Sequence, residues 1–207
     1  APSPDLATCD ANHEANADAL PPEAPVEIGA PFRTIAVASP LEMAILTKSG
    51  ATLCTDFSWI YQIDAMEWLA GDRLLGWNWS GDEAFGYHFV DRQGQGKLIE
   101  TGAMPFFSPS TSRFASIQLS DSGWGRMEGF GVWEVTEAGT RELSRQAASG
   151  PDYMRPAIFE TYDGDWRIAQ WQGESCVDIH FLPNDSDGNP QPSAAVPYHA
   201  RQSNDWQ

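Results

Sequence analysis

Four stretches of the chain share one pattern of apolar and polar positions. Each begins with an arginine, continues with two mostly apolar residues, and then alternates a small or amide residue with a larger apolar one. Alternation with a period of two residues is typical of a β-strand that packs one face against a core. The pattern therefore predicts four related strands, at residues 33–39, 73–79, 113–119 and 167–173.

The spacing of these stretches indicates an internal repeat. The arginines at 33, 73 and 113 are 40 residues apart, and 54 residues separate Arg113 from Arg167. A second element, Phe85-Gly86, recurs as Phe130-Gly131, and we interpret the two as matched positions. A repeat of about 40 to 50 residues is the size of a propeller blade. The pattern thus predicts an all-β fold, a small β-propeller of about four four-stranded antiparallel blades with almost no helix.

The same pattern divides the chain into a tail and one domain. Residues 1–25 are polar and acidic and have no strand period, so they are expected to form a tail. Residues 26–207 are expected to form a single propeller-like domain, and 207 residues with 42% hydrophobic content suffice for a core. The repeat units fall at about 26–56, 57–102, 103–150 and 151–200, and the first unit is expected to begin with a strand at 26–28.

Two stretches carry a resemblance to a known family. Met104-Pro105-Phe106-Phe107-Ser108-Pro109 leads into Arg113-Phe114-Ala115, and Tyr162-Asp163-Gly164 leads into Ile168-Ala169. Both resemble the blade repeat of TolB-like periplasmic propellers, over roughly residues 26–200 and most faintly in the first unit. The resemblance implies a fold and no reaction, since such repeats occur in proteins of many functions. A five-bladed ring completed by the tail and an open or associating half-propeller are alternatives to four closed blades.

Charge and hydropathy limit the partners. The formal net charge of −17 and a pI near 4.3 predict no binding to nucleic acid or anionic lipid, because both need a basic surface. A solvated acidic surface is the more common meaning of such a charge, and cations and basic proteins stay open as partners. The sequence has no window long and apolar enough for a transmembrane segment. The oligomeric state is left open.

The N-terminus and the cysteines bear on the compartment. Ala1-Pro2-Ser3-Pro4 is similar to the polar start of a mature secreted chain, so we expect a periplasmic or secreted protein; the poor lipoprotein box before Cys9 makes acylation the lesser alternative. Pairing of Cys9 with Cys54 would fasten the tail to the first unit and leave Cys176 as a buried thiol. Pairing of Cys9 with Cys176 is the rival, and three reduced thiols would require a cytosolic protein.

One loop stands out as a candidate binding surface. Residues 120–129 are longer than the equivalent loop at 80–84 and place Trp124 and Arg126 among glycines. An aromatic ring beside a guanidinium suits a planar, sugar-like or anionic group. The alternative is a Trp124 ring folded back onto the blade edge.

Metal sites and cofactors are not predicted. Asp185 and Asp187 partly match a calcium loop, but Pro183 stands where the first ligand belongs and no glutamate follows at the right distance, so a polar turn is favoured. The four histidines lack zinc-type spacing: they are His13, His88, His180 and His199. The repeated arginines and the turn acids Asp72 and Asp165 are expected to fix turns and blade contacts rather than bind a ligand.

Two classes of function follow. The chain has no nucleophile elbow, phosphate loop or dinucleotide fingerprint. The favoured hypothesis is therefore a non-catalytic binding or scaffolding propeller of the bacterial envelope or secreted space, with a protein, peptide or glycan as ligand. The alternative is a glycan-active hydrolase with a pair of carboxylates at the channel mouth. Its candidate acids are Glu67, Asp82, Glu83 and Glu160.

Overall fold

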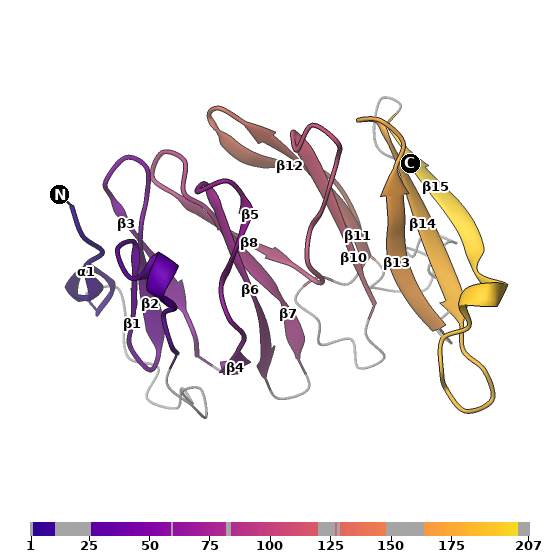
Figure 1. The fold of residues 1–207 in the computed structure, drawn as a ribbon, viewed down its shortest axis with the longest axis horizontal. Helices are drawn as coiled ribbons and strands as arrows, with labels where there is room; N and C mark the ends of the chain where they lie inside the picture. The colour runs from indigo at the N-terminus through magenta and orange to yellow at the C-terminus, as the bar shows by residue number, and fades with distance from the viewer. Residues whose placement is uncertain are drawn as a thin grey trace. The chain divides into compact units, whose positions relative to one another are not determined.

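The structure, a computed structural model, describes residues 2–10, 26–58, 60–81, 84–119, 127, 129–147 and 164–202. Within these residues the fold is all-β, and four antiparallel sheets follow one another along the chain (Figure 1). The chain divides into two compact units, Ala1–Glu100 with Glu137–Gly139 and Thr101–Thr136 with Thr140–Gln207. Each unit is built around two of the sheets. No helix among the described residues is long and apolar enough to cross a membrane.

The first sheet has three strands in the order β1-β2-β3. They are β1 (Ala36–Ala38), β2 (Glu42–Leu46) and β3 (Thr52–Asp56). The β2–β3 hairpin turns at Gly50, whose φ of 85° suits glycine. The expected strand at 26–28 is wrong, because this stretch is irregular and leads into a 3-10 turn, η1 (Ala30–Phe32). The first sheet is therefore one strand narrower, among the described residues, than four-stranded blades require.

The second sheet is centred on the repeat strand at Leu74–Gly81. Its strands are β4 (Ile60–Ile63), β5 (Glu67–Ala70), β6 (Leu74–Gly81), β7 (Phe85–Asp91) and β8 (Lys97–Thr101). β7 pairs with one edge of β6, while β4 and β5 pair with the two ends of its other edge. The sheet is thus four strands wide. It shares one apolar core with the first sheet, formed by residues such as Met43 and Ile45 of β2 and Leu75 and Trp77 of β6.

The second unit repeats this plan. Its first sheet, in the order β12-β11-β10-β9, consists of β9 (Phe106–Phe107), β10 (Arg113–Gln118), β11 (Gly129–Thr136) and β12 (Gly139–Ala147). Its second consists of β13 (Gly164–Trp171), β14 (Cys176–Pro183) and β15 (Val196–Arg201), which follows the 3-10 turn η4 (Pro192–Ala194). The two sheets share an apolar core that includes Ile117 and Val132 on one side and Ile179 and Phe181 on the other.

The register between strands corrects one sequence interpretation. Trp77 on β6 pairs with His88, and Ile117, which holds the same repeat position on β10, pairs with Phe130. Phe130 therefore corresponds to His88, and the match of Phe85-Gly86 with Phe130-Gly131 is wrong by three residues. His88 and His180 hold different positions in their sheets, because His180 pairs with Arg167 at the start of its repeat, whereas His88 pairs with Trp77, four residues after Arg73.

The glycines in these dipeptides nonetheless have a similar packing role. A Cβ atom at Gly131 would overlap the ring of Trp133, and one at Gly86 would lie 3.0 Å from Nε1 of Trp79. In each strand the missing side chain makes room for an indole ring on the same face of the sheet. Trp133 is then free to stack on Phe114, at 5.1 Å between ring centroids.

Candidate functional site

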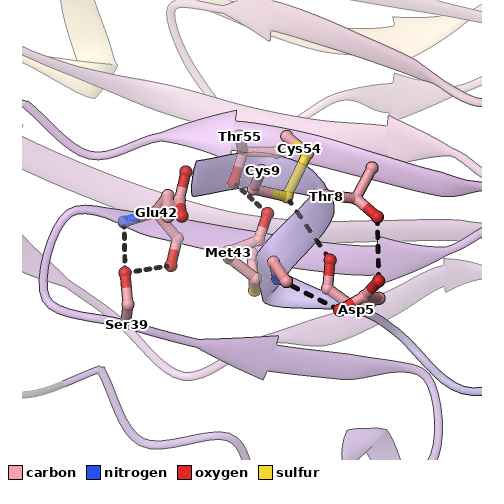
Figure 2. Close-up of a disulfide and its surroundings, with 9 residues drawn as sticks. Asp5, Thr8, Cys9, Ser39, Glu42, Met43, Cys54 and Thr55 are labelled. Atoms are coloured by element: carbon pink, nitrogen blue, oxygen red, sulfur yellow. Dashed lines mark hydrogen bonds between the residues drawn. A yellow bond between two sulfur atoms is a disulfide. The ribbon is translucent and has the colours of Figure 1, made fainter. Parts of the chain in front are cut away.

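The N-terminal segment is fastened to the first sheet by a disulfide (Figure 2). Cys9 on the short helix α1 (Leu6–Asp10) is bonded to Cys54 on β3, which is the pairing that the sequence analysis favours. Asp5 precedes the helix, and its carboxylate accepts hydrogen bonds from the Ala7 amide at 3.0 Å and the Thr8 hydroxyl at 2.9 Å. Cys176 is a buried free thiol. A disulfide of this kind is consistent with an oxidising compartment.

Most of the predicted ligand-binding and catalytic residues lie outside the described residues. These are Trp124 and Arg126 of the glycine-rich loop and the acids Asp82, Glu83 and Glu160. Among the described residues, Glu67 on β5 accepts a 3.0 Å hydrogen bond from the hydroxyl of Tyr87, and burial of that hydroxyl raises its pKa. The pair of catalytic carboxylates stays a prediction.

The acidic turn at 184–189 is organised by one carboxylate. Oδ1 of Asp185 accepts hydrogen bonds from the backbone amides of Asn189 and Asp187, both at 2.9 Å. These bonds hold the pKa of the Asp185 carboxyl below its ordinary value. Asp187 is exposed. The Asp185 carboxylate thus stabilises the turn in which it lies, as expected for a polar turn.

The repeated arginine of the second sheet pairs with a carboxylate on the neighbouring strand. Arg73 donates to both carboxylate oxygens of Asp91 on β7, at 2.8 and 2.7 Å, while Asp72 pairs with Lys48 of the first sheet. Arg92 donates to the carbonyls of Leu46 and Asp72, each at 2.7 Å. These charged groups therefore join strands and turns within the first unit, as expected for a supporting role.

The second unit has a comparable link at the β13–β14 turn. The Glu174 carboxylate accepts hydrogen bonds from the Ser110 amide and the Ser112 hydroxyl, both at 3.0 Å. Hydrogen bonds from the Ser108 hydroxyl and from these groups hold the pKa of Glu174 below its ordinary value. Arg113 donates to the Glu174 carbonyl and, at 2.7 Å, to Oε1 of Gln202. The turn of one sheet is thereby attached to the turn that precedes β10.

Replacement of Glu174 by glutamine tests this link. Because the folded-state pKa of Glu174 is lowered, its charge stabilises the fold above the unfolded-state pKa, and the contribution disappears as pH falls through the folded-state value. We expect Glu174→Gln to lower the free energy of unfolding by about 1 kcal/mol at pH 7. We also expect it to flatten the loss of stability below a pH of about 4.3, the ordinary range of a glutamate.

Chemical denaturation of the wild type and the variant at a series of pH values measures both effects. Glu142→Gln is the matched control, because Glu142 forms an exposed ion pair with Arg145, three residues away on the same strand. A pH profile unchanged by Glu174→Gln, or changed equally by Glu142→Gln, contradicts the link.

The most convergent polar group in the described residues lies on the last sheet and centres on Asp178. This buried carboxylate on β14 accepts hydrogen bonds from Nε2 of Gln170 at 2.7 Å, from Nε2 of Gln172 at 2.8 and 3.0 Å, and from Nδ1 of His199 at 2.7 Å. Burial favours the neutral carboxyl, but these hydrogen bonds outweigh it and lower the pKa of Asp178. Asp178 is therefore a fixed, ionised carboxylate.

A β-bulge assembles this group. Ile168 pairs with Ile179 and points to the apolar core, whereas Gln170, two residues later, pairs with Asp178 across a shift in register. Residues two apart normally share one face of a strand, so the bulge turns Gln170 onto the opposite face, beside the carboxylate. Bulges that redirect a side chain in this way are common near functional sites.

The donor atoms of Cys176, Asp178 and His199 all lie within 4.8 Å of one another. Cys176 and Asp178 are buried, and the more exposed Gln170, Gln172 and His199 surround them. Sequence reasoning missed this cluster because it sought ligands at close spacing along the chain. The only signal was the alternate positions 176 and 178 of one strand, and His199 joins them through pairing with Asp178.

In comparisons with known proteins, no family model, curated protein or solved structure matches the chain. The function must therefore be argued from the residues themselves.

Proposed function

We propose that the chain is a non-catalytic binding or scaffolding protein, built as a small propeller-like stack of sheets, that works in the bacterial envelope or the secreted space. The observation that carries the proposal is the repeated plan of the two units. In each, two consecutive antiparallel sheets pack through one apolar core and are joined by charged groups at their turns. Repeat folds of this kind offer their loops and exposed edges as binding surfaces while the stacked sheets supply rigidity.

The contacts of the described arginines favour a structural role for these charges over a catalytic one. Arg73, Arg92 and Arg113 all donate to strands or turns of their own unit. The disulfide between Cys9 and Cys54 supports an oxidising location. A ring of four blades, or of five with a contribution from the tail, would cover the sheet faces that an open stack leaves exposed, and is the arrangement we propose for the whole chain.

The ligand class we propose is a protein, peptide or glycan bound by loops, with Trp124 and Arg126 as the contact residues. Arrays of glycans and peptides probed with the labelled protein test this, and Trp124→Ala is the informative variant. We expect saturable binding to one class that Trp124→Ala weakens at least tenfold, in the range of an aromatic hot spot. Binding that the variant leaves unchanged removes the loop from the proposal.

The absence of catalysis is tested separately. The protein is incubated with the glycans that it binds, and release of new reducing ends is followed over time. We expect none. Sustained release that Glu67→Gln abolishes, while a Tyr87→Phe control that removes the hydroxyl bonded to Glu67 retains it, would overturn the non-catalytic assignment in favour of the hydrolase.

A further inference from the structure

We propose that Cys176, Asp178 and His199 form a zinc site on the outer face of the last sheet, with a fourth coordination position open to water or to an external ligand. The proposal goes beyond the binding function above, which requires no metal. It rests on the chemistry of the three donors, on their placement by strand register, and on the groups that orient them.

The donor set suits Zn²⁺. A thiolate, a carboxylate and an imidazole are the three kinds of side chain that bind zinc, and a thiolate with an imidazole disfavours the hard cations Ca²⁺ and Mg²⁺. The thiolate and the carboxylate supply two negative charges, which neutralise the ion in a largely buried position. Three protein ligands are the number found in zinc sites that keep an exchangeable fourth position.

The register places these donors on one face. Asp178 and His199 are directly paired residues of β14 and β15, and Cys176 lies two residues before Asp178, so all three side chains leave the sheet on the same side. The apolar residues between them, Val177 and Ile179, point to the core. The strand pairing thus gathers the ligands without help from a flexible loop.

The outer groups are those that a metal site needs. Gln170, redirected by the bulge, and Gln172 donate to Asp178 and fix the orientation of the carboxylate. The Asp178 side chain is 7% exposed and the His199 side chain 57% exposed, so an ion can enter from the histidine side. The two amides thus hold the Asp178 carboxylate in a fixed orientation, whereas the exposed His199 imidazole is free to adjust to an ion.

The His199 imidazole and the Asp178 carboxylate must separate to admit the ion. Nδ1 of His199 and Oδ1 of Asp178 are 2.7 Å apart, with a proton between them. Two tetrahedral ligands at zinc bond lengths of about 2.0 to 2.2 Å are roughly 3.3 to 3.6 Å apart, so the imidazole must withdraw by about 0.6 to 0.9 Å. The exposed His199 can make this movement, and the ion then replaces the shared proton while the Cys176 thiol gives up its proton to solvent.

Zinc titration against a chromophoric chelator tests the site on the full chain. We expect one equivalent of Zn²⁺ to bind and to protect Cys176 from a thiol-modifying disulfide reagent. We expect Cys176→Ala and His199→Ala each to weaken binding at least tenfold, and Gln170→Ala to weaken it about tenfold through the carboxylate. Substitution of the exposed His199 leaves the core untouched, so this variant tests the site even if Cys176→Ala unfolds.

His180→Ala is the matched control, because His180 lies on the same strand two residues beyond Asp178 and outside the cluster. Binding of Co²⁺ should give a thiolate-to-metal charge-transfer band that Cys176→Ala abolishes. The proposal is overturned if no metal binds, if Ca²⁺ or Mg²⁺ competes equally with Zn²⁺, if the thiol stays reactive in the zinc-loaded protein, or if His180→Ala weakens binding as much as His199→Ala. Loss of the zinc site would leave the proposed binding function untouched, since that is read out on the arrays.

Discussion

Reduction of the disulfide between Cys9 and Cys54 is expected to lower the free energy of unfolding by about 4 kcal/mol. The bond closes a loop across a sequence separation of 45, and the reduced chain would recover the conformational freedom that this closure removes from the unfolded state. Helix α1 has five residues and cannot persist alone, so we also expect the N-terminal segment to leave the first sheet. Denaturant unfolding with and without reductant measures the change in stability.

Two variants make this test specific. The double variant Cys9→Ser/Cys54→Ser should be as unstable as the reduced wild type and should no longer respond to reductant. Cys176→Ser should keep the full response, because Cys176 is not part of the bond. A wild-type unfolding midpoint that reductant leaves in place, with free thiols verified by mass spectrometry, would show that the N-terminal segment does not stabilise the fold.

The apolar alternation predicted the strands well because each repeat strand has one face in a core. Three of the four stretches became the strands β6, β10 and β13, and the first was shortened to β1. The alternation carries less information about register. The pairing of β10 with β11 depends on the length of the connection between them, and the same dipeptide, Phe-Gly, appears at different registers in two sheets. The glycine of this dipeptide leaves room for an indole ring, and which ring fills that room cannot be predicted from the local sequence pattern.

For the candidate sites too, the sequence indicates what depends on local pattern and not what depends on strand pairing. The pairing of Cys9 with Cys54 could be favoured but not separated from its rival with Cys176, since an isolated cysteine in a polar tail needs a partner and either cysteine could supply it. The cluster around Asp178 could not, because it depends on a bulge that redirects Gln170 and on the pairing of β14 with β15. The partner of Arg73 was likewise hidden, since Asp91 lies 18 residues away and reaches it only through the β6–β7 hairpin.

Replacement of Arg73 by methionine is expected to cost about 3 kcal/mol of unfolding free energy. Arg73 makes a bidentate hydrogen bond to Asp91, whose side chain is 1% exposed, so the variant leaves a buried carboxylate without its cation. The Gln93 amide still donates to Asp91 at 3.0 Å, which keeps the loss at the lower end of the range for a broken buried pair. The double variant Arg73→Met/Asp91→Asn also removes the negative charge of residue 91, and it should recover more than half of the lost unfolding free energy.

The repeat supplies matched controls for this prediction at the same position of two other strands. Arg113 lies 4.0 Å from a half-buried Glu134, so Arg113→Met should cost about 1 kcal/mol, mostly from its hydrogen bonds to the β13–β14 turn. Arg167 is exposed, and Arg167→Met should change the stability by less than about 0.5 kcal/mol. Denaturant unfolding of the three variants should therefore show the largest loss at Arg73, whose acid partner is buried, and the smallest at the exposed Arg167. Equal losses at all three positions would mean that the arginine serves the repeat itself, through the turn that precedes each strand, and that the burial of Asp91 does not decide the cost.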